Sequence, residues 1–187
     1  MSSVQPSLPD FGPRVETDEP GYSGLAPKSQ RKMGSTLPII RPVTEQDTEA
    51  VIALGREMYE RSAYKDLPFS EAVVRNNVSR IIGAGDGVMY VAEHNGEIIG
   101  MLAGSLSMFS FSYELYAKDH IFYVRQDMRG VGMVAVRLLK AFVEWARGKK
   151  VARIVMGNTA FPDDERVRAL FRTLGFEDSG IVMMRKV

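Results

Sequence analysis

The sequence predicts a mixed α/β domain with an antiparallel front half and a βαβ crossover behind it. Asn95-Gly96 separates two apolar runs, and this is the strongest short signal for a β-hairpin. An apolar run at 121–124 enters a glycine turn, an amphipathic helix leaves that turn, and a second apolar run follows at 152–156. This succession of strand, helix and strand is typical of a parallel crossover.

Composition and charge exclude several classes of protein. The chain has 187 residues, the usual size of one domain, and a formal net charge of +1, so no strong field indicates a nucleic-acid or membrane partner. It contains no cysteine, which removes disulfides, thiolate nucleophiles and cysteine-bound metals. Two histidines are too few for a histidine-built metal centre. Because we find neither a membrane-length apolar run nor a signal peptide, we expect a cytoplasmic protein.

The first 36 residues differ from the rest. They are rich in Pro, Ser, Gly and charged residues and show no regular apolar period. Such a segment buries too little apolar surface to offset its ordering entropy. We therefore expect a flexible tail at 1–36 and one folded domain at 37–187.

The front half of that domain begins with a short strand at 38–43, placed at a sheet edge because Pro42 cannot donate a ladder hydrogen bond. Thr44 then caps a helix, with Asp47 in the capping-box position. A second helix follows Ser70. The residues expected to point inward are Val51, Leu54 and Met58 on the first helix, and Val73, Val74, Val78, Ile81 and Ile82 on the second.

The hairpin strands are expected at 88–93 and 98–103, and an aromatic segment at 109–116 follows them. Alternation would place Phe109, Phe111 and Tyr113 on one side of an extended segment. That side could line an acceptor pocket, form the face of a homodimer, or belong to an ordinary core strand.

The back half contains the helix after the glycine turn, with Leu138, Leu139, Phe142, Trp145 and Ala146 on its apolar side. A strand at 152–156 follows. A last helix then opens at Asp163 or Asp164 and ends at Gly175, and a closing strand runs from 180 towards 187.

The glycine turn carries the clearest chemical signal. Arg129, Gly130 and Gly132 stand between a strand and the start of a helix. Glycines allow close approach of the backbone, and the first-turn N–H groups have no partner within the helix, so the turn can bind a diphosphate. A plain tight connection and a dinucleotide fingerprint are the alternatives. The fingerprint requires an acid at the end of the next strand, and 155–158 contains none.

The segment Arg129-Gly-Val-Gly132-Met-Val134 resembles the Arg/Gln-x-x-Gly-x-Gly/Ala motif of the GCN5-related N-acetyltransferase (GNAT) superfamily. Val134 departs from the small residue at the sixth position, and a one-residue shift would place Ala135 there, so the register stays open. The segment 169–176 is similar to the family's Ala-x-Tyr-x-x-x-Gly-Phe, with Phe171 in the tyrosine position. The resemblance covers 38–187.

This resemblance implies a mostly antiparallel sheet whose strands 4 and 5 are parallel and splayed, with helices on both faces. It also implies acetyl-CoA as co-substrate, its diphosphate on the amides of Val131 to Ala135 and its thioester on strand 4 near Val124, where the family often has a bulge. The implied cofactor-binding residues are Tyr123, Val124, Gln126, Arg129, Gly130, Val131, Gly132, Met133, Val134, Ala135, Asn158 and Phe171.

The catalytic groups are less clear. Phe171 cannot donate a proton to the departing thiolate, so either the enzyme is inactive or the acid is dispensable, with Tyr123 or water in its place. Asp119 and His120 stand where the family often has its general base. A strand-start role for Asp119 and a surface position for His120 are the alternatives.

Together these features predict direct transfer of an acetyl group from acetyl-CoA to an amine on a small molecule or peptide, without a metal. The sequence does not identify the acceptor. The alternatives are a non-catalytic acyl-CoA-binding module and a structural or interaction domain with the same fold.

Overall fold

A computed structural model describes residues 37–161, 165–180 and 182–185. The expected tail at 1–36 lies outside these residues. Five strands form one sheet in the order β1-β2-β3-β4-β5, antiparallel except for the parallel pair β4–β5. The strands are β1 (Ile39–Pro42), β2 (Gly87–His94), β3 (Glu97–Met108), β4 (Leu115–Val124) and β5 (Arg153–Val155). The mixed α/β prediction is confirmed.

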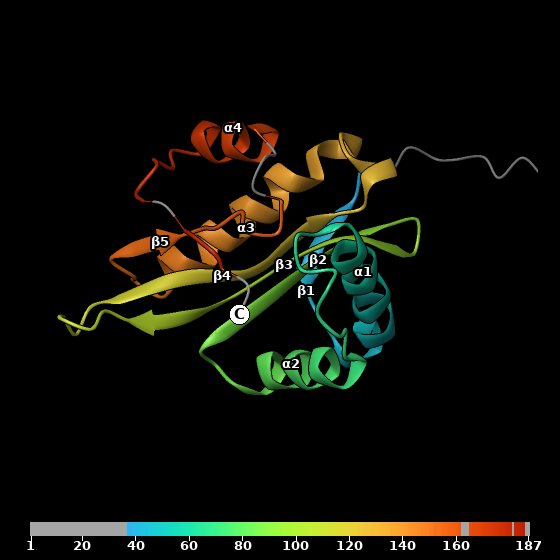
Figure 1. Cartoon of the computed structure of the whole chain (residues 1–187), viewed down its shortest axis with the longest axis horizontal. Coiled ribbons are helices and arrows are strands. Elements are labelled where there is room, and N and C mark those ends of the chain that lie inside the picture. Colours follow the sequence, from blue (N-terminus) through green and yellow to red (C-terminus); the bar gives the residue numbers. More distant parts are fainter. Residues whose placement is uncertain (1–36, 162–164, 181, 186–187) are drawn as a thin grey trace, which may run out of the picture. The chain divides into compact units, whose positions relative to one another are not determined.

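Helices cover both faces of this sheet (Figure 1). Helices α1 (Thr48–Arg61) and α2 (Glu71–Gly83) pack on one face, and α3 (Val134–Gly148) and α4 (Glu165–Thr173) on the other. Neighbouring strand residues point to opposite faces, so Val91 belongs to the α1/α2 core and Ala92 to the α3 core. Within the described part of the chain, no helix is long and apolar enough to cross a membrane.

Local signals set the ends of several elements. The Asp47 carboxylate accepts hydrogen bonds from Thr44 N at 2.8 Å and Thr44 Oγ1 at 2.9 Å, so the predicted cap is confirmed, although a 3₁₀ turn (Glu45–Asp47) precedes α1. Arg41 bridges Asp47 and Glu93, and it lowers the pKa of Asp47 to about 2. Asn95 and Gly96 both have positive φ, as a two-residue hairpin of this kind requires.

Two residues expected to point inward are exposed, and the expected closing strand is not seen in the described residues. Val73 and Ile82 are 57% and 41% exposed, because the inward stripe of α2 is only as wide as Val74, Val78 and Ile81. Phe111 is 85% exposed, which excludes the core-strand alternative for the aromatic segment: β3 and β4 are longer than predicted, and the segment turns at the tip of their hairpin. Residues 180 and 182–185 form no strand.

The end of the β4–β5 ladder creates the gap in the sheet. The two strands pair only at Tyr116↔Arg153, Ala117↔Ile154 and Lys118↔Val155, and then separate. In the neighbouring ladder Ala103 pairs with Ile121 and Gly104 with Asp119, which leaves His120 as the extra residue of a β-bulge. The splay is therefore confirmed. The bulge lies at His120, whereas the resemblance implied one near Val124, four residues later.

Gly104 allows the close packing of α3 on this sheet. A Cβ atom at Gly104 would lie 2.5 Å from Lys118 O and 2.6 Å from Phe142 Cε2, and Phe142 is fully buried. We expect Gly104→Ala to lower the free energy of unfolding by about 1–3 kcal/mol through overpacking, measured by denaturant titration. Gly148→Ala is the matched control, since a Cβ there meets nothing within 4 Å. Equal stability of the two variants would contradict this packing.

Candidate active site

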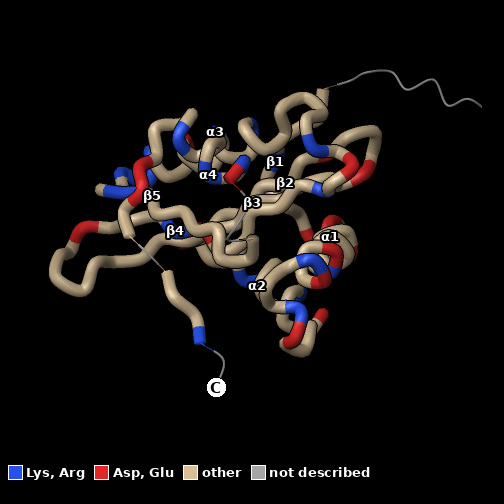
Figure 2. The backbone as a smooth tube through the Cα atoms, turned by 45° about the horizontal axis from the view of Figure 1, so that its top comes forward, with Lys and Arg blue, Asp and Glu red and all other residues tan. Residues whose placement is uncertain are grey.

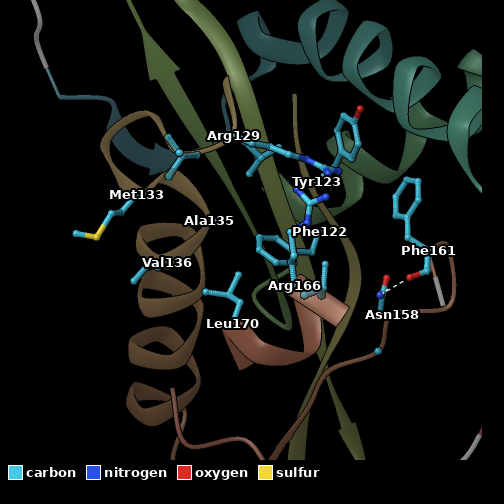
Figure 3. A pocket seen from close by; sticks show the side chains of 15 residues that line it. Phe122, Tyr123, Arg129, Met133, Ala135, Val136, Asn158, Phe161, Arg166 and Leu170 are labelled. Atoms are coloured by element: carbon cyan, nitrogen blue, oxygen red, sulfur yellow. Dashed lines mark hydrogen bonds between the residues drawn. The ribbon is translucent and has the colours of Figure 1, made fainter. Parts of the chain in front are cut away.

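A cavity of about 350 Å³ opens where β4 ends, between the glycine turn, the start of α3 and α4 (Figure 3). It brings together eight of the residues expected to bind the cofactor. These residues are Tyr123, Val124, Arg129, Gly130, Met133, Val134, Ala135 and Asn158. Gln126, Val131 and Gly132 do not appear among its described lining residues, and Phe171 lines a neighbouring cavity.

The backbone of the turn is unusual over a short stretch. Gly130, Gly132 and Met133 have φ angles of 91°, 52° and 52°, in the left-handed region, and α3 begins directly afterwards at Val134. The turn therefore reverses the chain sharply and leaves the N-terminus of a 15-residue helix at the cavity. Such a helix end presents N–H groups and a partial positive charge.

Gly132 has a packing role that the sequence does not indicate. A Cβ atom there would lie 2.5 Å from Pro38 Cδ, at the start of β1, and Pro38 is fully buried. Arg137 Nη1, on the first turn of α3, donates to Pro38 O. Gly132 is thus needed for the contact between the turn and β1, and a large side chain at this position would disturb folding as well as binding.

Two arginines reach into the cavity from different elements (Figure 3). Arg129 comes from the turn, as predicted, and Arg166 comes from α4. Arg166 was missed by sequence reasoning. It precedes Leu170 by one helical turn, so the two residues share a face of α4, and this spacing is the signal that could have found it.

Tyr123 is 3% exposed, and its hydroxyl donates to Glu57 Oε1 on α1 at 2.8 Å. Burial, and then the Glu57 carboxylate, raise the pKa of Tyr123 to about 12. The phenol therefore holds its proton firmly and already uses it in a hydrogen bond. This arrangement makes Tyr123 a poor acid and suits a structural part in the wall of the cavity. Glu57 is the second residue that sequence reasoning missed.

A second cavity of about 740 Å³ lies on the other side of the splay. It contains Asp119, His120 and Phe171 among its lining residues, together with Met58 and Tyr64 from the α1 side. The two cavities share four lining residues, namely Phe122, Gly157, Asn158 and Phe161. They therefore adjoin one another across the gap between β4 and the segment that follows β5.

Asp119 lies at the parting of the two strands. Its Oδ1 accepts a hydrogen bond from Gly157 N at 3.0 Å, where Asp119 lies one residue and Gly157 two residues beyond the last pair, Lys118 and Val155. Burial raises the pKa of Asp119 to about 6, although the Gly157 N–H opposes this shift. A carboxylate with this pKa is suited to accept a proton near neutral pH.

His120 and Phe171 have different surroundings. His120 Nε2 lies 2.7 Å from Ser105 Oγ on β3, and burial, with Lys118 and Arg80 nearby, lowers the pKa of His120. The Phe171 ring packs between Phe122 and Phe176, with centroids 6.2 and 5.8 Å away. Phe171 is therefore part of an apolar wall. His120 is a neutral imidazole at the bulge near neutral pH.

Known proteins resemble this chain in sequence and in fold. The model of the "Acetyltransferase (GNAT) family" matches residues 52–176. A search of curated protein sequences gives no match. Among solved structures, the chain is similar to AAC(6')-Iy in complex with the bisubstrate analog CoA-S-monomethyl-acetylneamine, with 17% identity and a TM-score of 0.65. That match covers 81% of this chain and 99% of the other.

Two further structures show the same fold. The aminoglycoside antibiotic 6'-N-acetyltransferase AAC(6')-IG from Acinetobacter haemolyticus is 20% identical, with a TM-score of 0.61 and coverage of 80% of this chain and 97% of that one. A predicted acetyltransferase with acetyl-CoA from Clostridium acetobutylicum is 16% identical, with a TM-score of 0.64 and coverage of 80% and 96%.

The raised pKa of Asp119 gives a stability prediction. Because its folded pKa lies above the usual 3.8, ionisation costs folding free energy, and stability should fall as pH rises from about 4 to about 6 and stay low above that. Asp119→Asn retains an acceptor for Gly157 N without the charge. We expect it to raise the free energy of unfolding at pH 8 by at most about 3 kcal/mol, measured by denaturant titration. The gain should disappear at pH 4, and a loss of stability at pH 8 would contradict it.

Proposed function

The chain belongs to the acetyltransferase (GNAT) family, and from this premise we propose that its two adjoining cavities transfer an acetyl group from acetyl-CoA to an amine. The smaller cavity would hold the donor and the larger one the acceptor. The observation that carries the proposal is their junction at the β4–β5 splay, with a cationic turn on one side and a partly buried carboxylate on the other.

The donor side suits a diphosphate ester. Arg129 and Arg166 supply positive charge, and the amides at the start of α3 supply hydrogen-bond donors. The backbone of β4 beyond Ile121 lacks a β5 partner, because the parallel ladder ends at Lys118. An extended pantetheine arm can take the place of the missing strand there, next to Tyr123 and Val124.

The reaction proceeds at the junction. The amine nitrogen forms a bond to the thioester carbonyl carbon, the C–S bond breaks, and the sulfur leaves as a thiolate. Asp119 takes the proton that the amine loses. The chain has no cysteine to carry the acetyl group, so transfer is direct. A thiolate with a pKa of about 8.5 needs little protonation to leave, so phenylalanine at position 171 slows the reaction without preventing it.

We extend the proposal to the domain that carries the activity, its location and its partners. We assign the activity to residues 37–187 and place it in the cytoplasm. The acceptor is an amine on a small molecule or a peptide, and neither nucleic acid nor a membrane takes part. The near-zero net charge supports this view. The exposed aromatic hairpin tip is the face that a homodimer would use.

The direct test is turnover. Purified protein with acetyl-CoA and a panel of primary amines should release free thiol and form acetylated amine, identified by mass spectrometry. Tight binding of acetyl-CoA by calorimetry without any product would instead identify a binding module, as Phe171 could also suggest. Absence of both binding and product would refute the assignment of the donor cavity.

The two arginines of the donor cavity give a binding prediction. Removing one charge-assisted contact to a phosphate costs about 1.5–3 kcal/mol, so Arg166→Gln should raise the Kd for coenzyme A by about 10-fold or more. Arg129→Gln should act in the same direction, and both effects should shrink at high salt. The control is Arg147→Gln, since Arg147 pairs with Glu144 on the exposed end of α3. Calorimetry that shows the same Kd for all three variants would refute the placement of the diphosphate.

The pKa of Asp119 predicts how the rate depends on pH. Only the ionised carboxylate accepts a proton, so kcat/KM should rise through an apparent pKa near 6 and then reach a plateau. An aromatic amine that stays neutral over this range separates this titration from that of the acceptor. Asp119→Asn should lower kcat by about 10²- to 10⁴-fold and abolish the rise. A pH profile that is unchanged in this variant would exclude Asp119 as the base.

A further inference from the structure

The walls of the larger cavity indicate which kind of amine it accepts. We infer that the acceptor is a primary amine on an apolar or aromatic body, with a single positive charge, and not a polycation. This inference rests on the proposed function, because it concerns the acceptor side of the same site. It differs from the aminoglycosides that name several of the similar structures.

The charges of the described lining residues are balanced. Three carboxylates face three permanent cations, in addition to His120. The acids are Asp119, Glu177 and Asp178, and the bases are Lys118, Arg168 and Arg172. Acidic and basic positions are also interspersed along α1, on the acceptor side (Figure 2). A polycation binds best where negative charge dominates the surface, and the described residues of these walls carry no such excess.

Asp178 is already neutralised by the neighbouring helix. Arg172 Nη2 lies 2.5 Å from Asp178 Oδ2, and Arg168 Nε lies 3.9 Å from Asp178 Oδ1. Arg172 and Arg168 lie one turn apart on α4 and both face this carboxylate. The Arg172 guanidinium also lowers the pKa of Asp178. Binding an ammonium group at Asp178 would require displacing these arginines.

Part of the wall of the larger cavity is apolar and can contact the body of an apolar acceptor. Phe122, Phe171 and Phe176 form a continuous row of rings, and Met58 and Tyr64 line the α1 side of the same cavity. Ala63 N donates to Ala160 O at 3.0 Å, which ties the α1–α2 loop to the segment after β5 and fixes the wall beside Tyr64. Rings in this arrangement can bury the body of an apolar ligand, whereas a hydroxyl-rich polycation would lose hydration there.

Asp119 provides the negative charge nearest the donor cavity. It is the carboxylate at the junction with the donor cavity, so one amine can reach it while the rest of the acceptor lies against the rings. One carboxylate at the reacting end and an aromatic wall behind it match a monoamine such as 2-phenylethylamine. Of the other two described carboxylates of this cavity, Asp178 is held by Arg172 and Arg168, so only Glu177 remains for the further ammonium groups of a polyamine.

The test compares kcat/KM for 2-phenylethylamine and for spermidine at the same acetyl-CoA concentration. We expect at least a 10-fold preference for 2-phenylethylamine, with only a weak dependence on salt. A preference for spermidine would refute the inference while confirming acetyl transfer. Binding of acetyl-CoA without acetylation of either amine would refute the inference, and the proposed function would fall with it only if the wider panel of amines also gave no product.

A charge variant makes the test sharper. Arg168→Gln with Arg172→Gln exposes the Asp178 carboxylate to the cavity, and both side chains are at least half exposed, so the fold should be retained. We expect kcat/KM for spermidine to rise about 10-fold, with an unchanged Kd for acetyl-CoA. The matched control is Arg75→Gln with Arg147→Gln, which releases Glu49 and Glu144 on exposed helices. No rise, or an equal rise in the control, would contradict a role for these arginines in selecting the acceptor.

Discussion

The loss of pairing between two parallel strands is the constraint on which the rest of this molecule depends. Main-chain groups inside a sheet must find partners, and β4 beyond Lys118 finds none on β5. At the parting of the strands the Asp119 carboxylate accepts the Gly157 N–H, and in the β3–β4 ladder His120 is the extra residue of a bulge. What remains is an open stretch of strand edge in the middle of the domain, where an extended ligand can pair.

The chemistry of the site follows from this opening. Asp119 is partly buried where the two strands part, and burial raises its pKa to about 6. Asp119 lines the larger cavity, and its partner Gly157 lines both the larger and the smaller cavity. The Asp119 carboxylate that accepts the Gly157 N–H is thus the same group to which we assign the role of base in the proposed reaction.

The sequence predicted those parts of the fold that neighbouring residues determine. Thr44 with Asp47 marks a helix start, Asn95-Gly96 marks a hairpin, and the period of α3 marks its buried side. It could not predict contacts between distant segments. Arg166 reaches the donor cavity only because α4 packs beside α3, and Glu57 meets Tyr123 across 66 positions of sequence. The sequence left open whether Phe111 is in a core strand or on the surface, because the same aromatic pattern occurs in a core strand and at a hairpin tip.

The contact between Pro38 and Gly132 links the segment just before β1 to a turn more than ninety positions away. The glycine turn is therefore supported by packing against Pro38, next to β1, and not by its own sequence alone. Shortening the chain past Leu37, or fusing a bulky partner directly to Pro38, would remove this support while leaving the motif of the turn intact. The glycine turn therefore limits how far the domain can be truncated from its N-terminus, as much as the edge strand β1 does.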